Sequence, residues 1–228
     1  MTAHSGPRWF EEALARSGAN ERLAAQLRFV LELDKAKTVL RRTYLTDGSR
    51  LEDDAQHMWH ALMAAIVLAE HAAERVDPIR LALMLAVHDV VEIDAGDTFI
   101  YDDAGMATKT ERERLAADRI FGILPPDQQE LFRQLWEEFE EHDTATARMA
   151  TAIDRLLPLL MNRALDGRSW REHGVSFERV YARNSTIEQG SPALWAVGRQ
   201  VLEQATAESL FGAGPGARGA PPGGEAEG

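Results

Sequence analysis

The chain has 228 residues, of which 45% are hydrophobic, and a formal net charge of −12 at pH 7. This length and composition suit one soluble globular domain with a sizeable core. The acidic excess weighs against a nucleic-acid polymer as partner, because duplex binding draws on clustered Lys and Arg, and the absence of cysteine excludes disulfides and thiolate chemistry.

Helical periodicity dominates the chain, and no segment shows the alternation of polar and apolar residues that is typical of a strand. Asp77-Pro78 and Ser191-Pro192 each place an N-cap residue before a proline at the first helical position, and Pro125-Pro126 also predicts a helix start. We therefore expect an all-α fold, with helices near residues 8–17, 20–41, 52–72, 78–94, 110–122, 126–142, 145–166, 176–187 and 192–209.

Two segments lie outside this helical pattern. Residues 97–108 lack a helical period and are expected to form a loop after Gly96, whereas residues 212–228 are rich in Gly and Pro and are expected to be a disordered tail. The prediction is thus a single helical bundle of residues 1–211 followed by this tail. We expect the five tryptophans to be core anchors.

No apolar run approaches the length of about 20 residues that a membrane-spanning helix needs. Leu81 to Val87 spans seven residues and Ala61 to Ala69 spans nine, and Met1 to Trp9 lacks the apolar stretch of a signal peptide. We expect a cytoplasmic protein without membrane contact.

The most informative feature is an apolar helix that suddenly carries polar residues. Leu81, Leu85, His88 and Glu92 recur at spacings of four, three and four, so the polar groups share a face with buried leucines. Burying an ionised carboxylate without a partner costs several kcal/mol or more, at the order-of-magnitude level. A divalent cation or a buried ion pair would compensate for this cost, and the local sequence offers few basic residues for an ion pair.

Two further apolar helices also contain a polar residue, His57 in one and Asp154 in the other. Pro158 lies four residues after Asp154, removes a helical hydrogen bond and predicts a kink there. Together with His88 and Asp89, these residues provide two imidazoles and two carboxylates. This ligand set suits one divalent transition metal (Mn, Co, Fe or Zn) better than calcium, which prefers all-oxygen sites.

The pattern His57 … His88-Asp89 … Asp154 resembles the defining motif of the HD superfamily of metal-dependent phosphohydrolases. Residues 50–57, and His88-Asp-Val-Val-Glu92 with Gly96-Asp97, are similar to the 5'-deoxynucleotidase branch of that superfamily. Residues 170–195 resemble a bacterial subset, so the resemblance covers about residues 20–210. It implies the HD-domain helical fold.

The resemblance also implies residue roles. His57, His88, Asp89 and Asp154 match the metal ligands. Glu92 matches the acidic residue that works beside the metal water, and Asp97 matches the aspartate that contacts the deoxyribose; we place both among the catalytic residues. Arg41 matches the arginine that grips the phosphate, with Arg42 as its neighbouring competitor, and Glu138 is a further acidic candidate. The sequence departs from the family at Gln56, where a glutamate is common, and at Arg42-Thr43, where bacterial relatives have an aromatic residue.

The function that follows is removal of the 5'-phosphate from (deoxy)nucleoside monophosphates by metal-activated water, in a protein that the resemblance implies is a homodimer. Hydrolysis of another phosphoester and a non-catalytic role in metal or nucleotide binding are the alternatives. A di-iron oxygenase is disfavoured, because only His142 lies between the His-Asp pair and Asp154.

Overall fold

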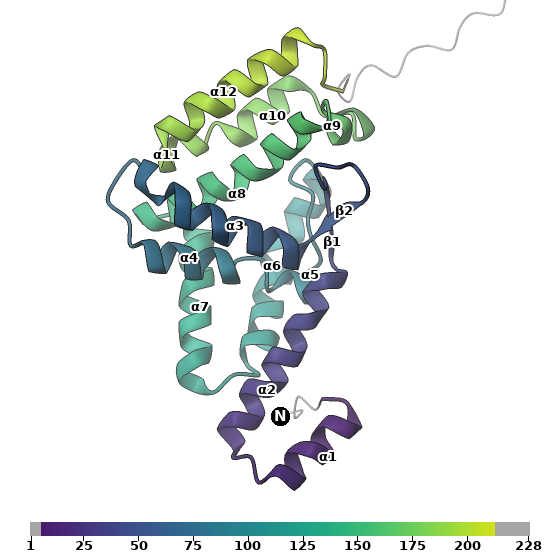
Figure 1. Cartoon of the computed structure of the whole chain (residues 1–228), viewed down its shortest axis with the longest axis vertical. Coiled ribbons are helices and arrows are strands. Elements are labelled where there is room, and N and C mark those ends of the chain that lie inside the picture. The colour runs from purple at the N-terminus through teal and green to yellow at the C-terminus, as the bar shows by residue number, and fades with distance from the viewer. Residues whose placement is uncertain (1–5, 213–228) are drawn as a thin grey trace, which may run out of the picture.

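The computed structural model describes residues 6–212, and they form a helical bundle with one small β-hairpin, as the sequence predicted except for the hairpin (Figure 1). Two 3₁₀ helices, η1 (Asp34–Thr38) and η2 (Ala69–His71), and the strands β1 (Leu40–Tyr44) and β2 (Leu51–Asp53) accompany the α-helices. The helices are α1 (Arg8–Ser17), α2 (Glu21–Leu33), α3 (Asp54–Leu68), α4 (Pro78–Val87), α5 (Glu92–Ala95), α6 (Asp103–Phe121), α7 (Pro126–Glu141), α8 (Ala145–Ala164), α9 (Arg168–Glu172), α10 (Phe177–Asn184), α11 (Ile187–Gly190) and α12 (Pro192–Ala207).

The β-hairpin corrects the predicted helix of residues 20–41. Helix α2 ends at Leu33, and β1 pairs antiparallel with β2, with Leu40 opposite Asp53 and Tyr44 opposite Leu51. The turn between the strands includes Gly48, whose φ of 72° favours glycine. The strands are short and pair only with each other, so neither carries the long alternation by which a sequence reveals a strand. The hairpin places β1 beside the start of α3.

The predicted helix starts at the prolines are confirmed. The Asp77 carboxylate accepts hydrogen bonds from the backbone N–H groups of Ile79 and Arg80, and the Ser191 hydroxyl accepts one from Leu194. Helix α3 begins with a capping box in which Asp53 and Gln56 satisfy each other's backbone N–H groups. The cap fixes the first turn of α3.

The predicted helix of residues 78–94 is interrupted where its polar residues begin. Helix α4 ends at Val87, turns follow, and α5 starts at Glu92 and ends at Ala95, before Gly96, whose φ is 73°. In a regular helix His88 and Asp89 would point about 100° apart. Because they lie at the end of α4, both side chains reach the same place.

Three other expectations need correction. Helix α6 begins at Asp103 instead of residue 110, so the predicted loop of 97–108 is shorter. The short helix α9 was not predicted, and α10 and α11 replace one helix of 176–187. Trp136, Trp170 and Trp195 are buried as expected, but Trp9 and Trp59 are exposed.

Helix α8 is the central element of the bundle. It packs against α4, α7, α11 and α12, and Figure 1 shows it between the C-terminal helices and the pair α3–α4. Ala147, Ala150 and Ile153 on this helix are fully buried, and Pro158 lies within it as predicted. None of the described helices combines the length and apolarity that a membrane crossing requires. The predicted tail of 212–228 falls outside the described residues except for Gly212, so it stays a prediction.

Candidate metal centre and its cleft

The four predicted ligands lie together, and they come from three helical segments. His57 is in the first turn of α3, His88 and Asp89 follow α4, and Asp154 is in α8. The Asp154 Oδ1 atom lies 2.9 Å from His57 Nε2 and 3.6 Å from His88 Nε2. Asp89 Oδ2 lies 3.8 Å and 3.1 Å from the same two nitrogens. Two imidazoles and two carboxylates therefore converge on one point.

Both imidazoles are held so that their Nε2 atoms face this point. His88 Nδ1 lies 3.0 Å from the Leu85 carbonyl oxygen, which requires the proton on Nδ1, so the Nε2 of the neutral ring is the atom that would bind a cation. His57 Nδ1 lies 3.5 Å from Glu52 Oε2. The His88 Nε2 atom is buried and has no hydrogen-bond partner among the described residues. This orphaned nitrogen between two carboxylates fits a divalent cation, as does the donor set.

A second group of acids lies against the first. Carboxylate oxygens of Asp54, Asp89 and Glu92 lie within 4.8 Å of one another, and Asp54 and Glu92 are almost completely buried. Neither Glu52 nor Asp54 was given a role from the sequence. The only indication of them in the sequence was the acidic run shortly before His57. By itself, such a run predicts no more than the cap of a helix.

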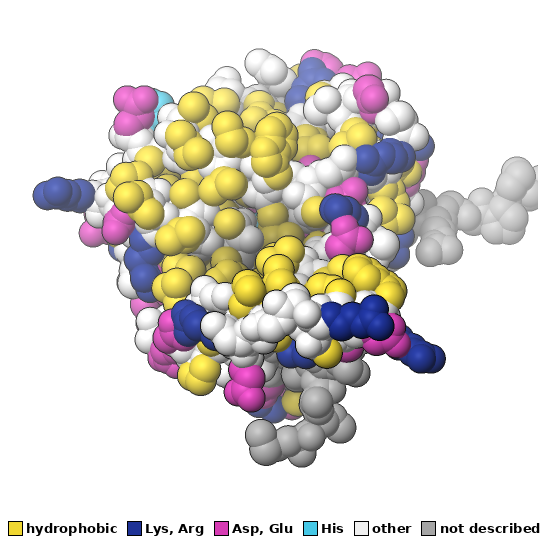
Figure 2. All heavy atoms as spheres, turned by 60° about the horizontal axis from the view of Figure 1, so that its bottom comes forward, with side chains coloured by type: hydrophobic (Ala, Val, Ile, Leu, Met, Phe, Trp, Pro, Cys, Tyr) yellow, Lys and Arg dark blue, Asp and Glu magenta, His cyan; other side chains and the backbone are white. Residues whose placement is uncertain are grey.

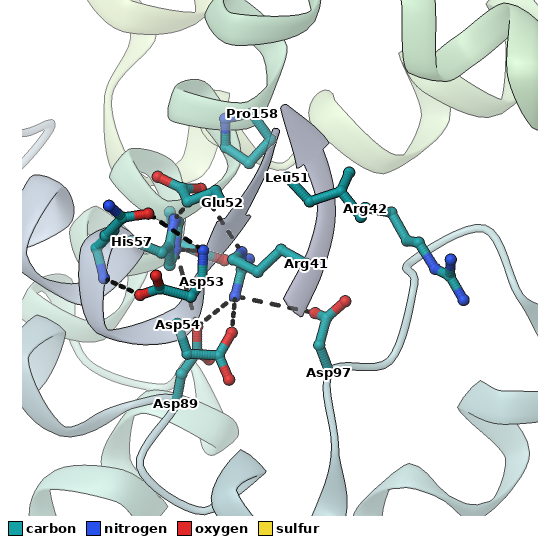
Figure 3. Close-up of polar contacts among 12 residues, drawn as sticks. Arg41, Arg42, Leu51, Glu52, Asp53, Asp54, His57, Asp89, Asp97 and Pro158 are labelled. Carbon is teal, nitrogen blue, oxygen red and sulfur yellow. Dashed lines mark hydrogen bonds and ion pairs between the residues drawn. The ribbon is translucent and has the colours of Figure 1, made fainter. Parts of the chain in front are cut away.

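Arg41 on β1 points into these acids (Figure 3). Its Nη1 atom lies 2.6 Å from Asp89 Oδ2, 3.4 Å from Asp54 Oδ1 and 3.9 Å from an Asp97 oxygen. The sequence offered no local basic partner for Asp89, but the partner comes from a strand 48 residues earlier in the chain. Arg42 points the opposite way, because successive side chains of a strand alternate.

This packing of charges shifts several pKa values. Burial and the charge of Asp89 raise the pKa of Asp54 to about 7, and the same two causes raise that of Glu92 well above its ordinary value. Burial alone would lower the pKa of His88, but Asp89 and Asp154 outweigh it and raise the pKa to about 10. In the absence of a cation, bound protons on these groups therefore offset part of the negative charge of the carboxylates.

A cleft of about 300 Å³ opens beside the four ligands. Asp89 and Asp154 line it, as do Glu92 and Asp97, while His57 and His88 are buried behind them. Glu138, the other acidic candidate, does not line the cleft, since it binds Arg80 and Thr144 instead. The neighbouring Glu140 lines the cleft, because it lies two residues further round α7.

The family model for the HD domain matches residues 33–195, which include the hairpin and every predicted ligand. The chain belongs to the HD domain family.

Solved and curated relatives agree with this assignment. The crystal structure of a predicted metal-dependent phosphohydrolase from Magnetospirillum magnetotacticum superposes with a TM-score of 0.81 at 50% identity, covering 84% of this chain and 96% of that one. The 5'-deoxynucleotidase HDDC2 of Mus musculus is 31% identical over 63% of this chain and 69% of its own length. The Homo sapiens protein of that name is 29% identical, over 57% and 62% respectively.

Proposed function

We propose that this HD domain protein is a metal-dependent phosphohydrolase that removes the 5'-phosphate from (deoxy)nucleoside monophosphates. The observation that carries the proposal is the position of the four converging ligands at the wall of a cleft. A structural metal site is usually closed by protein ligands, whereas a catalytic one keeps a position open. Here Asp89 and Asp154 face the cleft, so a substrate can approach the centre.

A divalent cation bound by His57, His88, Asp89 and Asp154 would lower the pKa of water and neutralise charge on the phosphoryl group. The two histidines favour Mn, Co, Fe or Zn over calcium. Glu52 would hold the His57 ring in position from behind, as carboxylates commonly do for metal-binding histidines.

Glu92 is proposed as the proton donor to the leaving oxygen. It lines the cleft, its Oε2 atom is buried without a hydrogen-bond partner among the described residues, and burial beside Asp89 raises the pKa of its carboxyl group. A positioned acid of this kind contributes about 10²–10⁴-fold in rate. Asp97 also lines the cleft and is proposed to contact the sugar.

Arg41 is proposed to contact the phosphate that is removed. Its guanidinium lines the cleft beside Asp89, and a phosphate dianion next to several carboxylates needs a fixed positive charge. The aromatic residues Phe99 and Tyr101 line the same cleft, whose volume lies at the lower end of small-molecule sites. These features and the 5'-deoxynucleotidase relatives support a nucleotide substrate.

The test is phosphate release from a panel of ribo- and deoxyribonucleoside 5'-monophosphates by protein loaded with Mn, Co, Fe or Zn. We expect hydrolysis of the monophosphates, and loss of activity on chelation. Release only from cyclic or pyrophosphorylated nucleotides would assign the reaction to another phosphoester. Nucleotide binding without any release would make the protein a non-catalytic binder, and two irons per chain with oxygen-dependent turnover would make it an oxygenase.

A homodimer is proposed on a separate observation. The face of α3 that carries Trp59, Ile66 and Val67 is exposed, with each of these residues at least 60% accessible, and Ile79 and Leu83 on the neighbouring helix α4 are exposed as well. Figure 2 shows hydrophobic side chains gathered over one side of the molecule. Large exposed apolar surface marks association sites.

Light scattering after size exclusion tests the dimer. We expect twice the monomer mass for the wild type and the monomer mass for a Trp59→Glu, Ile66→Glu double variant. Val197→Glu is the matched control, since Val197 is also exposed but lies on α12. A monomeric wild type would contradict the proposal.

A further inference from the structure

Three arginines from three separate elements line the cleft. They are Arg42 on β1, Arg155 on α8 and Arg183 on α10, and we call them the arginine wall. Within residues 6–212, Arg42 and Arg155 form no ion pair. Arg183 has only a distant one, 3.9 Å from Asp103, whose carboxylate is already bound by Arg179 at 2.9 Å. The arginine wall therefore presents positive charge that the described protein does not neutralise.

The other cationic side chains of the cleft are paired. Lys109 lies 2.7 Å from Glu113 and 3.5 Å from Glu140, and Arg41 is held by the acids of the metal centre. An anionic group that enters the cleft away from the metal centre therefore meets available positive charge at the arginine wall.

Of the three arginines, Arg155 has the least satisfied guanidinium group. Its Nε atom is buried and has no hydrogen-bond partner, and one Nη atom donates to the backbone carbonyl of Arg183. A buried charge without a partner is costly, so such groups are usually compensated by a ligand or an ion.

We propose that the arginine wall binds a second phosphate group of the substrate, separate from the phosphate that is hydrolysed. This inference rests on the proposed function and adds to its substrate class phosphomonoesters that carry a further phosphate. A phosphate fits better than a carboxylate, because three guanidinium groups match a dianion with several acceptor oxygens. Arg155 directly follows Asp154 in α8, so the second site adjoins the metal centre.

The experiment compares kcat/KM for 2'-deoxyadenosine 5'-monophosphate and 2'-deoxyadenosine 3',5'-bisphosphate with the manganese-loaded full chain. We expect the wild type to prefer the bisphosphate by about tenfold or more, as charge-assisted hydrogen bonds to phosphate would give. Arg155→Met should reduce this ratio severalfold, mainly through KM for the bisphosphate.

Two further variants keep the result interpretable. Arg42→Met should also reduce the ratio, and because Arg42 is exposed and unpaired within the described residues, its loss should not impair folding. Arg163→Met is the matched control on α8: this arginine binds Glu208 and does not line the cleft, so the ratio should stay at the wild-type value. No preference in the wild type, or equal loss on both substrates in Arg155→Met and Arg42→Met, would overturn the proposal.

Failure of the proposed function gives a different result. If the wild type releases phosphate from neither nucleotide, hydrolysis is excluded and calorimetric binding of the same two nucleotides decides the second site. Tighter binding of the bisphosphate that is lost in Arg155→Met would support the arginine wall, and equal affinities would overturn it.

Discussion

The metal centre and the arginine wall line the same cleft but carry an excess of charge of opposite sign. In the metal centre, carboxylates exceed the cationic groups, and Arg41 alone lies within 4.0 Å of five of them. At the arginine wall the excess is positive, and Arg155 forms no ion pair within 4.0 Å among the described residues. Each region carries charge that the other lacks, so the cleft favours a bound cation at the metal centre and an anionic group at the arginine wall.

Adjacent residues of one strand illustrate the difference. Arg41 and Arg42 have the same side chain and follow each other in β1, yet one is enclosed by acids and the other reaches the exposed rim of the cleft (Figure 3). The alternation of side chains along a strand separates them. Residue type alone therefore does not tell which arginine contacts which part of a substrate.

The largest effect should come from removing a carboxylate of the metal centre. Asp154→Asn should abolish tight metal binding and lower turnover by at least about 10⁴-fold, because it removes both the cation and the setting in which Glu92 acts. Metal content and phosphate release measure the two losses. Asp94→Asn is the control, since Asp94 binds Arg119 outside the cleft. Normal metal content in Asp154→Asn would contradict the ligand assignment.

Glu92→Gln separates the chemistry from metal binding within the same region. We expect the variant to keep its metal but to lose about 10²–10⁴-fold in turnover, since the amide cannot supply a proton. Metal analysis and single-turnover kinetics check the two parts. Full activity would remove Glu92 from the mechanism.

Glu52→Gln tests whether the residues behind the ligands tune the centre. The change weakens the support of His57 Nδ1, and we expect metal affinity to fall by about 10–100-fold with the fold intact. Competition with a chelator measures this affinity. Glu138→Gln should leave it unchanged, because Glu138 binds Arg80 away from the cleft. An equal change of metal affinity in the two variants would contradict the proposed support of His57 by Glu52.

The two regions should also differ in their response to pH, because arginines keep their charge while the metal centre titrates. In metal-free protein, Asp54 and His88 bind protons more tightly when folded, with pKa values of about 7 and about 10. The free energy by which these bound protons stabilise the fold is therefore lost as pH rises. The loss falls between about pH 4 and 7 for Asp54 and between about pH 6.5 and 10 for His88.

A bound cation takes the place of these protons, so the rise in Tm on adding manganese should grow from pH 6 to pH 8.5. Thermal unfolding with manganese and with chelator, at matched pH, measures the difference. A rise in Tm that shrinks toward high pH would speak against proton and metal sharing one site.

Much of the bundle was predictable from local rules. The proline starts at Pro78, Pro126 and Pro192 depend only on neighbouring residues, and all three are confirmed. The hairpin was missed because its two short strands stabilise each other only after they pair. The exposed Trp59 was misjudged because the position of a helix face depends on what packs against it.

The sequence by itself determined which side chains lie among apolar residues: the spacing predicts His88 and Glu92 on a buried face, and both are buried although the helix is interrupted between them. Only the tertiary structure decided their partners. Arg41 meets Asp89 across 48 residues, and Arg155 and Arg183 meet from different helices. Local spacing fixes the direction of a side chain within its own element, but the electrostatic field that acts on it comes from elements that the chain brings together on folding.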